Sequence, residues 1–157
     1  LIVGVIFHFV MGFILEWQNR KARPVKYAMY KGSRNSMFVS RNMIISGFVI
    51  LSFLVLHFYD FWVPEMDYKY IQVKPENPDR YYEELIHKFE SPIRVSLYCL
   101  SFIFLALHLV HGLSSSTQSL GTNNKYASVI HKISYVFGIG IPLGFCFIAL
   151  YHFFIHI

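Results

Sequence analysis

Four histidines lie inside long apolar stretches of this sequence, and their imidazole rings are the groups there most capable of chemistry. They are His8, His57, His108 and His111. An ionisable side chain in the hydrocarbon of a membrane is costly and usually faces the bundle interior or a cofactor. Imidazole is also a common axial ligand of haem iron. Because three separate apolar stretches supply these residues, the sequence predicts a cofactor site between helices.

The elements that must hold these histidines are membrane-spanning helices. Of the 157 residues, 55% are hydrophobic and 18% are aromatic, and the mean hydropathy is +0.43. A soluble domain of this length has too little interior for so much apolar surface. A span of about 20 residues gives about 30 Å of helix, enough to cross the bilayer core. We therefore expect an all-α integral membrane protein, one transmembrane helix bundle with helices at approximately residues 1–16, 42–63, 93–114 and 129–156.

The charged residues predict the orientation of these helices. Segment 18–41 contains seven Lys or Arg residues and no acid, whereas segment 60–91 contains eight of the nine acidic residues. By the positive-inside rule, 18–41 and 114–131 are cytoplasmic loops and 60–91 is external. The ninth acid, Glu16, ends the first span. No acidic side chain is therefore expected to be buried within a span.

Depth in the membrane then sorts the histidines. At about 1.5 Å per residue, His8 lies about 13 Å and His108 about 9 Å from the cytoplasmic helix ends, whereas His57 lies about 21 Å deep. Two axial ligands of one iron need nearly equal heights, so His8 and His108 can pair and His57 needs another partner. The sequence begins at Leu1 inside an apolar run, and we expect that partner on a preceding helix. This predicts two haems, one in each leaflet.

Glycines beside the histidines allow two interpretations. Gly4 and Gly12 flank His8 at four residues on either side, and Gly112 follows His108 by four. A porphyrin lying against a helix needs such missing side chains. Small residues equally allow helices to pack closely.

Several further residues are weaker candidates for the site. His111 competes with His108 as a ligand, or could bond to a haem propionate or quinone, or be interfacial. Polar residues near the cytoplasmic ends could neutralise propionates, namely Gln18, Arg20, Ser40 and Arg41. The other four histidines are expected to be solvated or interfacial.

Other functions fit the sequence less well. A zinc site would need ligands close in sequence or converging with acids, and no Cys-x2-Cys pair occurs. A transporter would more typically bury an acid in a span. The basic loop needs no nucleic acid to explain it, because cytoplasmic membrane loops are basic anyway. A haem-free anchor of a soluble enzyme and an unrelated transporter remain the alternatives.

Four short stretches carry a resemblance to a known family. They are Gln18-Asn19-Arg20-Lys21-Ala22-Arg23, then Leu56-His57-Phe58 with Phe61-Trp62, then His108-Leu109-Val110-His111-Gly112, and Gln118-Ser119-Leu120-Gly121. With them the chain resembles the membrane cytochrome b subunit of succinate:quinone oxidoreductases, the succinate dehydrogenase and fumarate reductase family. The resemblance covers essentially all residues. It is to the single-polypeptide, five-helix, two-haem type of Bacteroidetes-like bacteria, with the chain matching helices two to five.

The resemblance implies a function and its residues. His8 and His108 would hold one haem b on the cytoplasmic side, with the His-x3-Gly spacing favouring His108 over His111. His57 would hold the external haem with a histidine of helix one. The subunit would sit in the bacterial inner membrane and pass electrons between menaquinone and the iron–sulfur and flavoprotein subunits docked on its cytoplasmic face. It would have no dicarboxylate site of its own. Some relatives carry a proton-transferring Glu two residues before the helix-four histidine, where this chain has Ala106.

Overall fold

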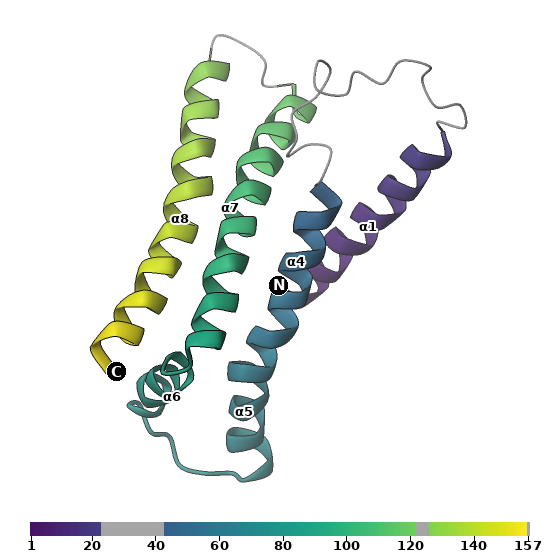
Figure 1. Ribbon diagram of the computed structural model, residues 1–157. Helices are drawn as coiled ribbons and strands as arrows, with labels where there is room; N and C mark the ends of the chain where they lie inside the picture. The colour runs from purple at the N-terminus through teal and green to yellow at the C-terminus, as the bar shows by residue number, and fades with distance from the viewer. Residues whose placement is uncertain (23–42, 122–125, 157) are drawn as a thin grey trace.

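The computed structural model describes residues 1–22, 43–121 and 126–156, and the expected all-α architecture is confirmed there (Figure 1). Every regular element in these ranges is helical. In chain order they are α1 (Ile2–Lys21), α4 (Met43–His57), η1 (Phe58–Trp62), α5 (Val63–Met66), η2 (Asp67–Ile71), α6 (Arg80–Phe89), α7 (Pro92–Ser119) and α8 (Ala127–His156).

Four helices have the length and apolar composition to cross a membrane, as expected for a multi-pass protein. They are Ile2–Lys21, Met43–Ile71, Pro92–Thr117 and Ala127–His156. The second differs from the sequence interpretation, which ended it near residue 63. Two π-helical stretches, η1 and η2, continue the helix to Ile71, and α6 forms within the expected external loop. Roughly the first third of that loop is therefore a helical extension of the span.

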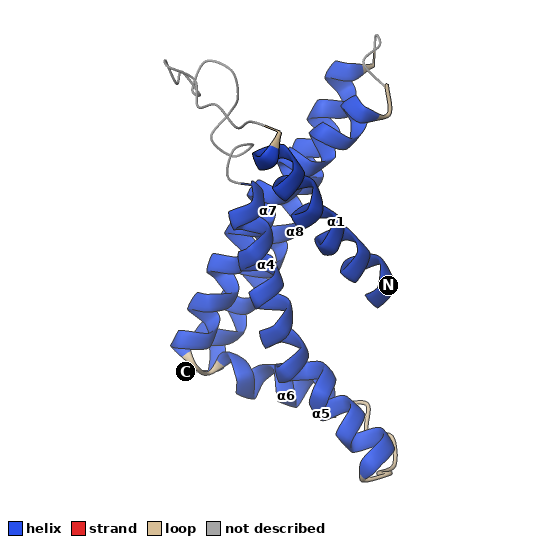
Figure 2. Cartoon of the chain, turned by 90° about the vertical axis from the view of Figure 1, so that its right-hand side faces the viewer, coloured by secondary structure: helices blue, strands red, loops and turns tan. Residues whose placement is uncertain are grey.

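The bundle is built around α7. Helix α8 packs along one side of α7 and α4 along the other (Figure 1), and the three helices overlap in the side view of Figure 2. Helices α7 and α8 approach so closely that a Cβ added at Gly138 would lie only 2.9 Å from the backbone nitrogen of Val110. Helix α1 leans away from the bundle and contacts α4. Among the described residues of α1, none is buried within this chain.

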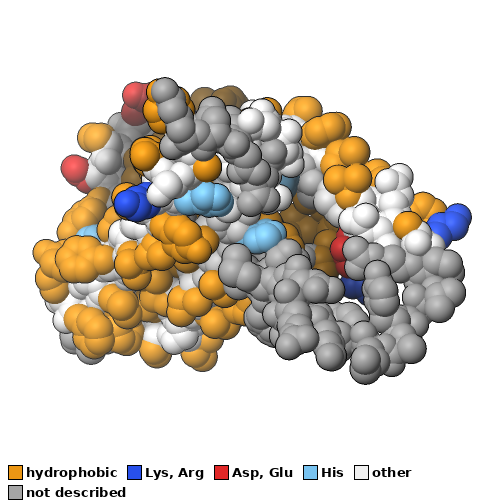
Figure 3. Space-filling model, turned by 90° about the horizontal axis from the view of Figure 1, so that it is seen from above, with side chains coloured by type: hydrophobic (Ala, Val, Ile, Leu, Met, Phe, Trp, Pro, Cys, Tyr) orange, Lys and Arg blue, Asp and Glu red, His pale blue; other side chains and the backbone are white. Residues whose placement is uncertain are grey.

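The buried hydrophobic side chains form one cluster toward the α6 end of the bundle, on the predicted external side. They are Phe89, Val95, Tyr98, Phe102 and Ala149. Elsewhere large hydrophobic side chains point outward, and orange side chains cover much of the described surface seen in Figure 3. This inside-out pattern is expected of helices that face lipid, because lipid tails are as apolar as the side chains that meet them.

Candidate functional site

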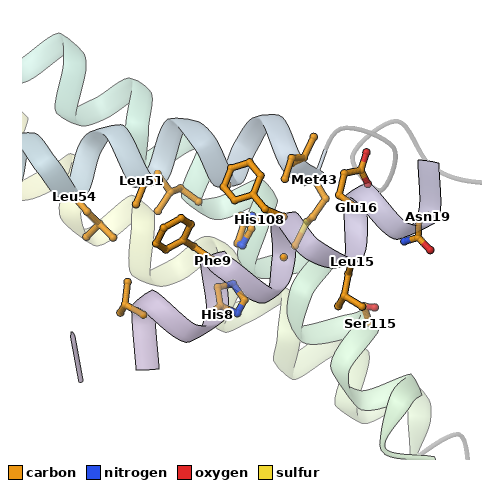
Figure 4. Close-up of a pocket in the computed structure, with 16 residues that line it drawn as sticks. His8, Phe9, Leu15, Glu16, Asn19, Met43, Leu51, Leu54, His108 and Ser115 are labelled. Carbon is orange, nitrogen blue, oxygen red and sulfur yellow. The ribbon is translucent and has the colours of Figure 1, made fainter. Parts of the chain in front are cut away.

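A cavity of about 440 Å³ lies between α1, α4 and α7, and two of the predicted ligands line it. His8 comes from α1 and His108 from α7, and Figure 4 shows both beside the same space. The volume falls within the range of about 300–1,000 Å³ that is usual for small-molecule sites. His8 is exposed within this chain and His108 is half-buried.

The two rings have a spacing that suits one metal between them. Their centroids are 6.1 Å apart and their planes are nearly perpendicular, at 82°. A bond from a metal to an imidazole nitrogen is about 2 Å long. Two imidazoles on opposite sides of one metal therefore have centroids roughly 6 Å apart, once roughly 1 Å is added for each ring. The depth estimate had predicted these two residues at one height, and the structure places them side by side.

Ser46 fixes the proton of the His108 ring. Its Oγ lies 3.1 Å from His108 Nδ1 and donates its own hydrogen to the Met43 carbonyl at 2.9 Å. A Ser46 hydroxyl that donates to the Met43 carbonyl can only accept from His108, and in that arrangement the proton sits on Nδ1. His108 Nε2 is then the unprotonated nitrogen, the form that binds a metal. Ligating histidines almost always donate their other ring N–H in this way.

The cavity is apolar at one end and polar at the other. Leu51 and Leu54 lie at the apolar end, whereas Glu16 and Asn19 lie toward the loop that follows α1 (Figure 4). Ser115 also lines the cavity. The polar end thus carries one carboxylate, that of Glu16, beside the neutral side chains of Asn19 and Ser115.

The predicted propionate partners are placed differently from the expectation. The Arg20 guanidinium lies 2.6 Å from the Glu16 carboxylate and is largely exposed. Gln18 is exposed and does not line the cavity, whereas its neighbour Asn19 does. Ser40 and Arg41 lie outside the described residues.

The glycines divide between the two interpretations. Gly12 lines the cavity, and a Cβ there would meet no described atom within 4 Å. Gly112 instead faces the Met43 side chain, at 3.5 Å from its would-be Cβ, so it serves helix packing. Gly47 is a further small residue beside His108, because a Cβ added there would lie 3.6 Å from Cε1 of the His108 ring. Gly4 has open space around it but does not line the cavity.

His57 lies at a second level, among aromatic rings. It stacks on Phe53 at 5.7 Å and contacts Phe61 at 5.2 Å and Tyr98 at 6.3 Å between centroids. Along α4, His57 follows Ser46 by eleven residues, or about 16 Å of helix. Of the described rings in contact with it, none is a histidine. Its Nδ1 is buried and has no hydrogen-bond partner among the described residues.

The remaining histidines lie outside the cavity. His111 is half-buried and does not line it, so only His108 of this pair faces His8. His131, expected to be solvated, is half-buried with Nδ1 3.1 Å from Ser114 Oγ. His152 and His156 stack at 5.9 Å as a His-x3-His pair. Among the described residues, no group of three or more His, Cys, Asp or Glu side chains could hold a metal ion.

The expectation that no acid is buried in the spans is wrong. The Asp60 side chain has no exposed surface. Its carboxylate pairs with Arg94 and accepts a hydrogen bond from Tyr98. The sequence interpretation counted Asp60 as external because it begins the acidic segment, but the helix continues past it. A Tyr and an Arg four residues apart on the neighbouring span were the available signal.

No known protein family, curated protein or solved structure matches this sequence. Its function must therefore be inferred from the site itself.

Proposed function

We propose that this chain is the membrane cytochrome b subunit of a succinate:quinone oxidoreductase. In this proposal it holds two b haems and passes electrons between menaquinone and iron–sulfur and flavoprotein subunits. The observation that carries the proposal is the facing pair of His8 and His108 across a cavity, with rings 6.1 Å apart. Haem b supplies the one-electron chemistry, and the protein supplies ligands, orientation and a dry environment.

The residues of the cavity have separate tasks in this proposal. His8 and His108 would be the axial ligands, and Ser46 would keep His108 in the binding tautomer. Gly12 leaves room for a flat ring beside α1. Asn19 and Ser115 would donate hydrogen bonds to acidic groups at the polar end.

His57 would ligate the second haem, one level closer to the predicted external face. The rings of Phe53, Phe61 and Tyr98 would give this level apolar surroundings. The second axial ligand must come from another helix or another chain, because no histidine ring contacts His57 among the described residues. The two levels are about 16 Å apart along α4, so electrons would cross the bundle in steps.

The partners would dock where the first cavity has its polar end. That end is formed by the C-terminal part of α1, and the chain continues from there into segment 18–41, whose seven basic residues predict a cytoplasmic location. Electrons from a soluble redox subunit would then enter at the His8–His108 level. In this proposal, substrate conversion belongs to the flavoprotein partner.

The test is haem counting on the detergent-purified complex that contains the full chain. A pyridine haemochrome assay should give two b haems per copy. His8→Ala and His108→Ala should each remove the same haem, and His57→Ala the other.

His111→Ala is the matched control, because His111 is close to His108 in sequence but does not line the cavity. It should keep both haems. A complex without haem would leave the chain a haem-free anchor, and equal haem content in all four variants would show that His8, His57 and His108 are not haem ligands; either result refutes the proposal.

A further inference from the structure

Asp60 places a carboxylate inside the bundle at the end of α4, and one of its oxygens is fully engaged. The side chain is 0% exposed. Oδ2 lies 3.0 Å from Arg94 Nε and 3.1 Å from the Tyr98 hydroxyl, which donates to it. A buried carboxylate is tolerated only where charge and hydrogen bonds compensate for lost hydration. Oδ2 meets that condition.

The other oxygen, Oδ1, does not. It is buried without a hydrogen-bond partner among the described residues, and Lys88 Nζ lies 3.9 Å away, beyond hydrogen-bond distance. His57 Nδ1 is also buried and unpartnered. Leaving one such atom unpaired typically costs about 1–3 kcal/mol. Asp60 Oδ1 is an acceptor and His57 Nδ1 a potential donor, so each could provide the partner that the other lacks.

These two atoms belong to one small neighbourhood. His57 ends α4, and Asp60 follows three residues later inside the continuous π-helical segment η1. Tyr98 contacts both, with its ring 6.3 Å from the His57 ring and its hydroxyl on Asp60. The π-helical segment η1 begins directly after His57 and contains Asp60. Such segments shift the register of following side chains and are frequent at functional sites.

We propose that Asp60 is the positioning residue of His57. When His57 binds iron through Nε2, Oδ1 accepts the hydrogen of Nδ1, directly or through one water. The inference rests on the proposed haem at His57. A carboxylate that accepts this hydrogen fixes the tautomer and makes the imidazole more electron-donating. Arg94 and Lys88 compensate for the charge that this interaction keeps inside the bundle.

The two haem levels would then differ in the partner of their ligand. His108 donates to the neutral hydroxyl of Ser46. His57 would donate to a carboxylate, and hydrogen bonds to an ionised acceptor are roughly twice as strong. A more electron-donating imidazole favours the ferric state. Asp60 should therefore lower the midpoint potential of the His57-level haem and leave the other haem unaffected.

The test is a redox titration of the α-bands in the purified complex, comparing wild type with Asp60→Asn. The haem that His57→Ala removes should titrate at a higher potential in Asp60→Asn, and the other haem should be unchanged. Asp60→Glu, which keeps a carboxylate, should return the potential toward the wild-type value. An equal potential in all three proteins overturns the inference.

Removing one buried charge also leaves Arg94 unbalanced, so a second variant is needed. Asp60→Asn combined with Arg94→Gln restores the local charge balance but not the carboxylate acceptor, and the potential should stay raised. Loss of this haem in both Asn variants but not in Asp60→Glu also supports the inference, whereas its loss in all of them alike overturns it. If His57→Ala removes no haem from the complex, the proposed function fails first, so the two failures are distinguishable.

Discussion

Replacing Ser46 by alanine should weaken haem binding at the His8–His108 level while leaving the fold intact. The hydroxyl accepts from His108 Nδ1 at 3.1 Å and is 5% exposed, so water cannot easily replace it. The substitution removes only one oxygen atom, and alanine is the best helix former. We therefore expect little change in helix content.

The magnitude follows from the hydrogen bond that is lost. A buried donor left without an acceptor costs about 1–3 kcal/mol. Without haem, the His108 ring can change tautomer or rotate, so most of this cost appears only when Nε2 must bind iron. At about 1.4 kcal/mol per factor of ten, haem affinity should fall by roughly 10- to 100-fold. This agrees with the usual effect of removing such a partner from a metal-bound histidine.

The assay is haem titration of the haem-depleted complex, followed by absorbance, with the His57 level as internal reference. Ser114→Ala is the matched control, because Ser114 Oγ makes the same 3.1 Å contact with Nδ1 of His131, away from the cavity. It should bind haem like wild type. Equal affinities in the Ser46 and Ser114 variants would show that the contact to His108 does not orient a ligand.

Two further predictions use pairs of glycines that differ in their surroundings. Gly12→Leu should remove the haem of the first level without destabilising the chain, because Gly12 lines the cavity and a Cβ there would meet no described atom within 4 Å. Gly4→Leu is the control, because Gly4 is equally open but does not line the cavity. It should keep that haem in the same haemochrome assay. Gly138→Ala should lower the free energy of unfolding by about 1–3 kcal/mol, the usual cost of overpacking, because its Cβ would press on the backbone of Val110. Gly140→Ala, with no described atom within 4 Å, should be neutral in the same thermal unfolding experiment in detergent.

The fold was largely predictable because the hydropathy and length of a membrane-spanning helix can be read from its own residues, without knowing which helices it packs against. All four spans lie where apolar residues accumulate. The end of the second span was not predictable in this way. Past residue 63 the residues become polar, yet the backbone stays helical to Ile71 through η1 and η2. A polar sequence marks the membrane boundary, but the helix itself ends only where its backbone hydrogen bonds do, and nothing requires the two ends to coincide.

For the site as well, one part could be predicted and another could not. Residue type and depth indicate the candidate ligands, whereas their hydrogen-bond partners depend on how each helix is rotated about its axis. Histidine is rare in hydrocarbon, so its type and depth indicated His8 and His108 as a pair, with His111 as a competitor, and the structure brings the rings of His8 and His108 together. Serine is common in transmembrane helices and usually bonds to its own backbone, as Ser46 also does. Its second contact, to His108, depends on how α4 is rotated about its axis, which hydropathy does not encode. Asp60 shows the same limit more strongly. The sequence interpretation placed it in the external loop because it begins the acidic segment. In the structure the helix continues past it, and the side chains of Lys88 and Arg94 compensate for its buried charge. The hydrogen-bond partners of ligands are thus the part of such a site that sequence reasoning misses first, and they are the part that sets how the ligands behave.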